Sequence, residues 1–149
     1  NHSIKDKANY LSYNIWSCGD YTKNLNGVAQ INDGLNVELS DEYSYNGDYC
    51  FKYTSNLNQY QGTNFNTISL PNNTTHVKLT LTAIKIVKGV EVRISENNDF
   101  ITLTVPENNN PQTITLEKEI TITNNFQITL IFRESNCIAY IDNICLITQ

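Results

Sequence analysis

Asp142 is the residue of this chain whose position most needs a chemical explanation. It lies within a C-terminal stretch, residues 126–147, that otherwise reads as two apolar strands joined by a short polar turn. A carboxylate in the middle of a strand lowers the β-propensity, and it loses hydration if it is buried. We therefore expect a compensating partner at Asp142, which could be a bound cation, a turn or bulge in the strand, or solvent.

A second group of candidate residues lies on the polar phases of two predicted strands, residues 90–95 and 126–133. These phases carry Glu91, Arg93, Gln127 and Arg133, and the chain has no other arginine. Successive side chains of a strand point to opposite faces, so these residues should point away from the core. If the two strands share a sheet, they could line one polar surface. The alternative is an ordinary solvated surface with charge pairs between strands.

Motifs for catalysis are not apparent. Hydrolysis of a glycosidic bond uses two carboxylates that face each other across a cleft, whereas most acidic residues here fall in predicted turns. The chain has no G-x-S-x-G nucleophile motif and no glycine-rich phosphate loop. We therefore predict that the protein is not an enzyme.

Composition limits the class of protein. The chain has 149 residues, of which 40% are hydrophobic and 17% are charged, and this suits a single globular domain, residues 1–149. Its net charge is −5 and its ten Lys and Arg are scattered, which argues against nucleic acid as a partner. The apolar runs are strand-length, so membrane insertion is not expected. Because the chain begins at Asn1 and contains no Met, we expect a mature product or a segment of a longer protein.

The four cysteines, at positions 18, 50, 137 and 145, lack the spacing of a zinc site. An even number of cysteines suggests one or two disulfides, for which three pairings are possible. The alternative is that they are free, buried thiols.

Apolar residues recur mostly with period two, which predicts about ten short strands and no helix of useful length. Asp33-Gly34 between residues 28–31 and 35–39 predicts a hairpin. Residues 57–64 are polar and read as a loop, and residues 65–70 read as the strand that follows. The first dozen residues are polar and could be loose. The pattern as a whole is typical of an all-β sandwich.

Several segments resemble carbohydrate-binding modules with a galactose-binding-like jelly roll. Residues 140–146, YIDNICL, resemble the closing strand of these modules, and residues 44–53, SYNGDYCFKY, resemble their turn glycine and Tyr-rich strand. Residues 77–87 stand where the family has its central apolar strand, and residues 113–133 resemble the strand pair before the closing strand. The resemblance spans about residues 16–146 and implies a jelly-roll β-sandwich of two antiparallel sheets.

The resemblance also implies a structural Ca²⁺ ion where the first strands meet the last. The closing-strand aspartate is a usual ligand in these modules, and it corresponds to Asp142. Asp48, through its carbonyl oxygen, and Glu42 or Asp41 would complete the oxygen ligands that calcium prefers. The alternative is that Asp142 accepts backbone N–H groups at a bulge.

A sugar site combines aromatic rings, which stack on the C–H faces of pyranoses, with polar groups for the hydroxyls. The residues predicted to bind carbohydrate are Trp16, Tyr45, Tyr60, Glu91, Arg93, Gln127 and Arg133. Trp16 could instead belong to the core, as a Trp early in a sandwich often does.

The expected function is therefore that of a non-catalytic module of a larger secreted or cell-surface protein. Its partners would be a polysaccharide or glycan and the other modules of the same chain. One alternative is a structural or adhesive sandwich with no sugar site. Another is a viral or phage receptor-binding domain, since such domains also use jelly rolls.

Overall fold

The computed structural model describes residues 11–14, 28–31, 35–43, 50–65, 70–121, 123 and 125–149. These residues form eleven β-strands and no helix. The strands are β1 (Leu11–Asn14), β2 (Val28–Ile31), β3 (Leu35–Ser40), β4 (Cys50–Ser55), β5 (Gln61–Phe65), β6 (His76–Val87), β7 (Val90–Glu96), β8 (Asp99–Val105), β9 (Gln112–Glu119), β10 (Phe126–Phe132) and β11 (Ile138–Thr148).

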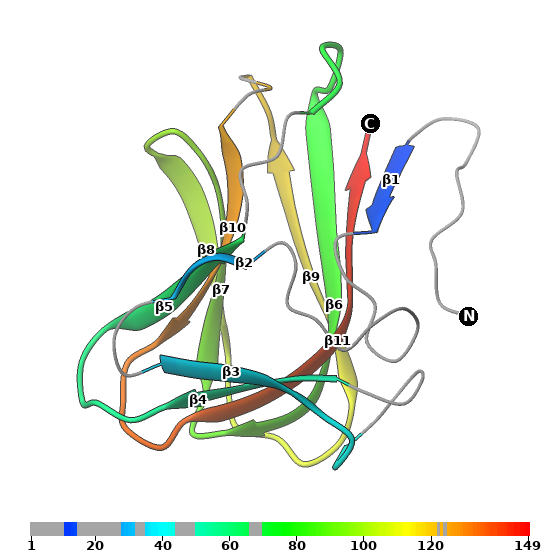
Figure 1. The fold of residues 1–149 in the computed structure, drawn as a ribbon. Helices are drawn as coiled ribbons and strands as arrows, with labels where there is room; N and C mark the ends of the chain where they lie inside the picture. The colour runs from blue at the N-terminus through cyan, green and yellow to red at the C-terminus, as the bar shows by residue number, and fades with distance from the viewer. Residues whose placement is uncertain are drawn as a thin grey trace.

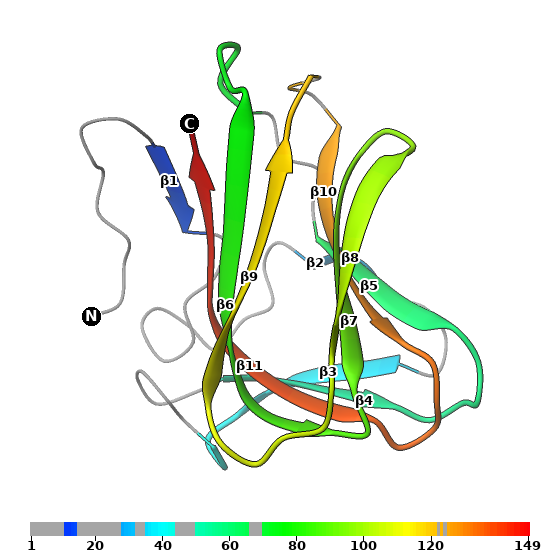
Figure 2. The same ribbon diagram turned by 180° about the vertical axis from the view of Figure 1, so that it is seen from behind.

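The strands form two antiparallel sheets (Figures 1 and 2). The six-stranded sheet has the order β3-β4-β11-β6-β9, and β1 also pairs with β11, beyond the end of β4. The five-stranded sheet has the order β2-β5-β10-β7-β8. This arrangement confirms the predicted all-β jelly-roll sandwich. The described residues contain no helix that is long and apolar enough to cross a membrane.

The core lies between the sheets and is built from the apolar phases that the sequence predicts. On β7 the buried hydrophobic residues are Val90, Val92 and Ile94, and β10 contributes its even-numbered positions in the same way. Tyr53 of β4 stacks on Phe132 of β10 with ring centroids 6.1 Å apart, so one aromatic pair joins the two sheets. Burying a side chain of this size stabilises the fold by roughly 1.5–3 kcal/mol.

β6 and β11 are the two longest strands, and both are irregular. On β6 the buried positions change from odd to even numbers, so that Leu79 and Leu81 are followed by Ile84 and Ile86. The change coincides with a register shift against β11, between Tyr140 and Ile141. A bulge of this kind bends a strand, and Figure 1 shows both strands curving at the lower end, toward β4 and β3.

Two of the sequence predictions about strands are wrong. β2 and β3 belong to different sheets, so the segment around Asp33-Gly34 does not join a hairpin. Residues 57–64 were expected to form a loop, yet β5 begins at Gln61 and pairs with both β2 and β10. The Asp-Gly motif predicts that the chain turns, but it does not determine which strands pair on either side of the turn. A polar strand is formed where both neighbours supply hydrogen bonds, whatever its own propensity. Of the predicted strand at residues 65–70, Phe65 is the last residue of β5, and residues 66–69 lie outside the described residues.

Candidate functional site

The outward side chains of β7 and β10 share one face of the five-stranded sheet, as the sequence allowed. β7 lies directly between β8 and β10, and its Arg93 stands opposite Thr102 on one side and Thr129 on the other. In the same way Glu91 stands between Thr104 and Ile131. We call this surface the polar sheet face. Its described residues are Phe100, Thr102 and Thr104 of β8, Glu91, Arg93 and Ser95 of β7, Gln127, Thr129 and Ile131 of β10, and Arg133 directly after β10.

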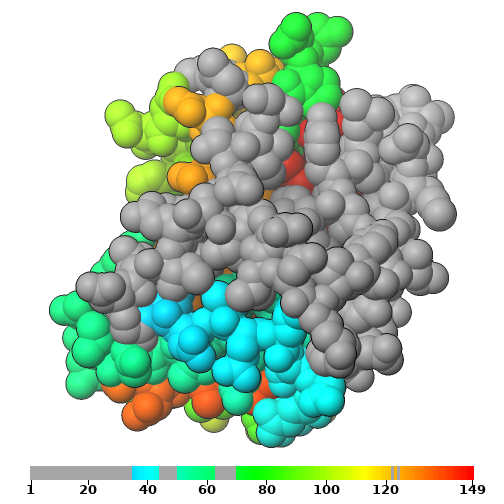
Figure 3. Space-filling view, in the orientation of Figure 1, coloured from blue at the N-terminus to red at the C-terminus, as the bar shows by residue number. Residues whose placement is uncertain are grey.

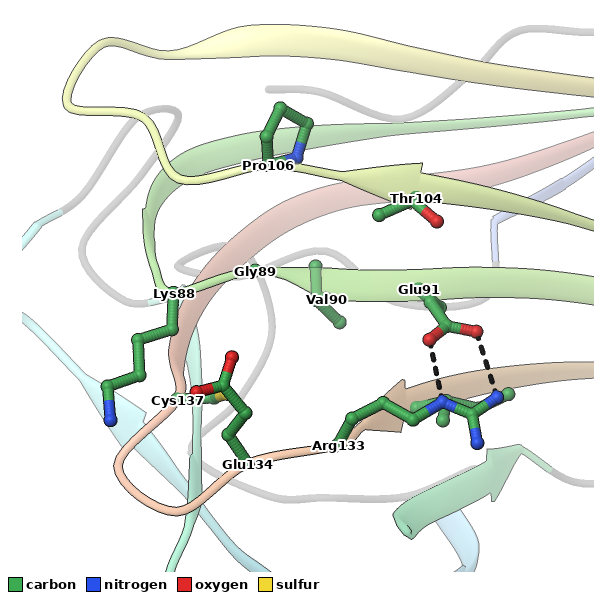
Figure 4. Close-up of a pocket in the computed structure, with 10 residues that line it drawn as sticks. Lys88, Gly89, Val90, Glu91, Thr104, Pro106, Arg133, Glu134 and Cys137 are labelled. Atoms are coloured by element: carbon green, nitrogen blue, oxygen red, sulfur yellow. Dashed lines mark hydrogen bonds and ion pairs between the residues drawn. The ribbon is translucent and has the colours of Figure 1, made fainter. Parts of the chain in front are cut away.

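Glu91 and Arg133 form a two-point ion pair on the polar sheet face. Arg133 Nε donates to Glu91 Oε2 at 2.7 Å, and Nη2 donates to Oε1 at 3.2 Å (Figure 4). The hydrogen bonds from Arg133 lower the pKa of Glu91, and the hydrogen bond to Glu91 raises the pKa of Arg133. The pair therefore keeps both groups charged and fixes their orientation.

Two exposed aromatic rings lie along this face, one beside the ion pair and one at the far end, and each has a guanidinium above it. The Arg133 Cζ atom lies 5.2 Å from the ring centroid of Tyr60, and the Arg93 Cζ atom lies 4.1 Å from that of Phe100. Tyr60 is 47% exposed and Phe100 is 49% exposed. From the level of Phe100, which stands opposite Ser95, to the level of Arg133 the strands rise by roughly 20 Å. The rings thus lie at opposite ends of a long polar surface.

A pocket of about 250 Å³ opens at the Arg133 end of this face. Ile131 forms part of its lining and is completely buried, although it lies on the outward phase of β10. Polar side chains surround the opening of the pocket, and Figure 4 shows Glu91, Thr104 and Arg133 there. The complete lining is Lys88, Gly89, Val90, Glu91, Thr104, Pro106, Ile131, Arg133, Glu134 and Cys137. An apolar lining with a polar rim suits a small ring-shaped molecule.

Phe100 and Ile131 were missed as candidate residues. Phe100 shares the outward phase of β8 with Thr102 and stands across the turn from Ser95, so the alternation of residues 99–105 could have revealed it. No such signal exists for Ile131. Its role depends on the pocket, which is assembled from β7, β8 and β10 and from the chain after each.

Asp142 is fully buried at a bulge in β11. The register against β6 shifts between Asp142 and Cys145, and Asn143 adopts the left-handed conformation with φ 53°. Asp142 Oδ1 accepts the backbone N–H of Asn143 at 2.7 Å. Bulk solvent therefore does not reach this carboxylate, and the structure has a bulge with a backbone N–H donor at Asp142, whereas the predicted cation stays a prediction.

The surroundings of Asp142 are electronegative. Burial, and then the negative charge of Asp142, raise the pKa of the Cys50 thiol to about 12 and that of Cys145 to about 11. Glu42 also acts on Cys50, so two of the predicted acidic ligands, Asp142 and Glu42, lie near the start of β4. Glu42 already has two partners, because Tyr140 Oη donates to it at 2.6 Å and Lys52 Nζ lies 3.8 Å away.

Asp142 supplies one of the oxygen ligands that a hard cation needs, but not a complete set. Asp142 supplies a buried carboxylate oxygen of the kind that Ca²⁺ prefers, and Asp48 lies two residues before Cys50 in the sequence. Within the described part of the chain, no cluster of three or more His, Cys, Asp or Glu side chains could hold a metal by itself. Any such site therefore requires Asp48, backbone carbonyls or water.

Glu42 belongs to the outer surface of the six-stranded sheet, with Tyr43 beside it. Residues 35–43 form a band along the lower part of the surface in Figure 3, coloured cyan. Tyr43 packs edge-on against Tyr140 at 4.7 Å, and Lys85 Nζ lies 5.1 Å from the Tyr43 ring centroid. Tyr43 thus repeats the aromatic–cation contact of the polar sheet face on the other sheet.

Three of the four cysteines, Cys50, Cys137 and Cys145, are described, and all three are free and buried. The predicted disulfides are therefore wrong for these residues, and the alternative of free thiols holds for them. Each sits in a strand or strand end that is already covered by its neighbours, so a crosslink is not needed to hold it.

Several predicted site residues lie outside the described residues, namely Trp16, Tyr45 and Asp48. The expected loose segment, residues 1–12, is also outside them except for Leu11 and Ser12, which begin β1. Their assignments remain predictions.

Comparison with known proteins places the fold among carbohydrate-binding modules. No family model and no curated protein sequence matches the chain. Among solved structures, the xylan-binding family 22 module of Paenibacillus barcinonensis has a TM-score of 0.61 and 10% identity, covering 97% of both chains. The C-terminal family 6 module of a laminarinase from Zobellia galactanivorans has a TM-score of 0.56 and 15% identity, covering 95% of this chain and 100% of that one.

A third similar structure is the enzymatically active domain of tailspike protein 4 from bacteriophage CBA120. Its TM-score is 0.69 at 13% identity, and the match covers 85% of this chain but only 20% of that chain. At these identities the similarity establishes the fold, a jelly roll of the carbohydrate-binding-module type.

Proposed function

We propose that this chain is a non-catalytic carbohydrate-binding module that holds a glycan along the polar sheet face. The observation that carries the proposal is the placement of two exposed rings, Tyr60 and Phe100, at opposite ends of a row of polar side chains. Aromatic platforms are what sugar rings stack on, and the side chains between them can hydrogen-bond the hydroxyls. The jelly-roll fold shared with carbohydrate-binding modules supports the same proposal.

Each part of the face has a separate task in this proposal. Tyr60 and Phe100 stack on sugar rings, while Arg93 and Gln127 donate to hydroxyl oxygens between them. The Glu91–Arg133 pair presents a fixed acceptor and a fixed donor, because each orients the other. Side chains held in advance lose little entropy when a ligand binds.

The pocket at the Arg133 end would take a single sugar ring. Its volume of about 250 Å³ is below the roughly 300 Å³ at which pockets for drug-sized ligands begin. Glu91 and Thr104 would contact the hydroxyls of that ring. The sheet beyond the pocket would then hold the rest of the oligosaccharide.

A structural Ca²⁺ ion at Asp142 is part of the proposal, with Asp48 and Glu42 as further ligands. The buried carboxylate of Asp142 and the position of Glu42 near Cys50 support this site. The ion would supply positive charge to a buried anion and would not contact the glycan. The bulge would hold the Asp142 carboxylate in place as one ligand of the ion.

In this proposal the module works as part of a larger secreted or cell-surface protein and acts with the other modules of that chain. Such a site would bind a single glycan with roughly micromolar to millimolar affinity, and neighbouring modules would add avidity.

The test is a glycan array with the purified chain, followed by calorimetry with the best ligand for the wild type, Tyr60→Ala and Phe100→Ala. Each variant should weaken binding about tenfold, since an aromatic contact contributes about 1 kcal/mol or more beyond its buried area. Tyr43→Ala is the matched control, because it removes an equivalent aromatic–cation contact from the other sheet. Retention of full affinity by both Tyr60→Ala and Phe100→Ala contradicts the placement of the site. A chain that binds no glycan would instead be a structural or adhesive sandwich.

A further inference from the structure

The polar sheet face is more positive than the protein that carries it. Its described side chains include two arginines and one glutamate, which gives this surface a net charge of +1, whereas the whole chain has −5. The glutamate, Glu91, is held by Arg133 at two points. The positive charge that remains therefore belongs to Arg93.

Arg93 forms no ion pair with any carboxylate among the described residues. Its neighbours across the strands are the hydroxyl-bearing Thr102 and Thr129, and the closest charged side chain on its own strand face is Glu91. An arginine in a protein does not lose its charge at ordinary pH. The surface thus offers a permanent cation without a direct ion pair among the described residues, because Glu91 acts on it only at a distance and is itself paired with Arg133.

Arg93 is also held in a defined orientation. Its Nε donates to Thr102 Oγ1 at 3.0 Å, and its Cζ lies 4.1 Å from the ring centroid of Phe100. Because Nε is already used, the two terminal nitrogens are the part of the guanidinium that can take a ligand. Two parallel N–H donors in one plane match the two oxygens of a carboxylate.

We propose that the polar sheet face selects an acidic glycan, and that Arg93 binds the carboxylate of a uronic acid residue while Phe100 stacks on the same ring or on its neighbour. This inference rests on the proposed function and adds the class of sugar. Two neutral sugar hydroxyls could accept hydrogen bonds from Arg93 but would not neutralise its positive charge. A carboxylate would supply the charge as well as both acceptors.

The decisive experiment compares one oligosaccharide in two forms, oligogalacturonate and its methyl ester, by calorimetry with the wild type, Arg93→Gln and Arg93→Lys. The wild type should bind the free acid about tenfold or more tightly than the ester, as expected for a two-point, charge-assisted contact. Arg93→Gln should abolish this preference, because it weakens binding of the free acid much more than binding of the ester. Arg93→Lys should restore only part of it, because an ammonium group lacks the planar pair of donors.

Controls separate this contact from general attraction of anions. Lys78→Gln removes one positive charge from β6 in the other sheet and should leave the preference intact. A sulfated glycan of similar charge density should bind less tightly than the uronate. If it binds equally well, the site senses charge alone and the assignment to a carboxylate fails.

The outcomes also distinguish this inference from the proposed function. Equal binding of acid and ester by the wild type, with Phe100→Ala still weakening both, overturns the uronate inference and leaves the glycan site standing. Absence of binding to the acid, to the ester and to every glycan on the array overturns both. A preference for the acid that survives in Arg93→Gln assigns the carboxylate to another residue and contradicts the role of Arg93.

Discussion

Lys118 and Glu96 form an ion pair that is almost completely buried and joins the two sheets at one edge of the sandwich. Lys118 Nζ of β9 lies 3.3 Å from Glu96 Oε1 at the end of β7, and the side chains are only 7% and 3% exposed. Lys118 also reaches the exposed Asp99 at 2.8 Å. Glu96 accepts in addition from the backbone N–H and the hydroxyl of Thr121. β9 and β8 are the edge strands of their sheets here, so the pair closes an edge that lacks further strands.

We expect Lys118→Met to destabilise the protein by about 3 kcal/mol or more, because it leaves the Glu96 carboxylate buried without its cation. The double variant Lys118→Met/Glu96→Leu should recover most of that loss, since removing both charges avoids a buried, unpaired anion. Urea unfolding of the wild type and the three variants, including Glu96→Leu alone, measures both values. A loss below roughly 0.5 kcal/mol for Lys118→Met contradicts the assignment, because changes of that size are typical of exposed pairs.

A second prediction concerns the charge of Glu91. The hydrogen bonds from Arg133 hold the pKa of Glu91 below the ordinary value of 4.5, so the ion pair is complete at neutral pH. Its contribution to stability is therefore fully present above the ordinary pKa and is lost as the pH falls through the lowered one. An NMR titration of the Glu91 side-chain carboxyl carbon should show a midpoint below 4.5, and Arg133→Gln should move the midpoint upward. A midpoint that Arg133→Gln does not move would contradict the pair.

The parts of the fold that the sequence predicted correctly are those that packing decides locally. Val90, Val92 and Ile94 alternate with polar residues because one side of β7 faces the core, and the pattern alone reveals this. The same reasoning placed Glu91 and Arg93 on the outward phase. The pattern leaves open whether β7 and β10 are neighbours, because strand order depends on contacts between distant segments.

Features that depend on strand order could not be predicted in the same way. The pairing of β5 with β2 and β10 turns a polar segment into a strand, although Gly62 and Asn64 disfavour it locally. Ile131 lies on the outward phase and is nevertheless completely buried, because the Glu91–Arg133 pair and the end of β8 lie beside it. The bulge at Asp142 lies in the pairing of β11 with β6, which no local pattern encodes.

The buried thiols lead to a third prediction. Burial and the charge of Asp142 raise the pKa of Cys50 to about 12 and that of Cys145 to about 11. Because the thiolate is the reactive form, neither residue should react measurably with a thiol reagent at pH 8 in the folded state. In a Cys18→Ser/Cys137→Ser background, Ellman's reagent should report no thiol under native conditions and two after denaturation. Rapid modification of either one in the folded protein contradicts the burial described for them.

The final prediction tests the proposed calcium ion. If Ca²⁺ binds at Asp142, adding it at about a hundred times its Kd should stabilise the fold by about 2.7 kcal/mol, and EDTA should remove that gain. Asp142→Asn should abolish the response while keeping an oxygen that can accept the Asn143 N–H at the bulge. Glu119→Gln, an exposed position on β9, is the control for the loss of one negative charge.

Thermal unfolding of the wild type, Asp142→Asn and Glu119→Gln, each with Ca²⁺, with Mg²⁺ and with EDTA, separates the two explanations of Asp142. A Tm increase that is specific to Ca²⁺ and absent from Asp142→Asn supports the ion. Identical Tm values for the wild type under all three conditions contradict it. Asp142 would then act only as the acceptor that holds the bulge, and Asp142→Asn should change the Tm little, because its side-chain oxygen still accepts the same N–H group.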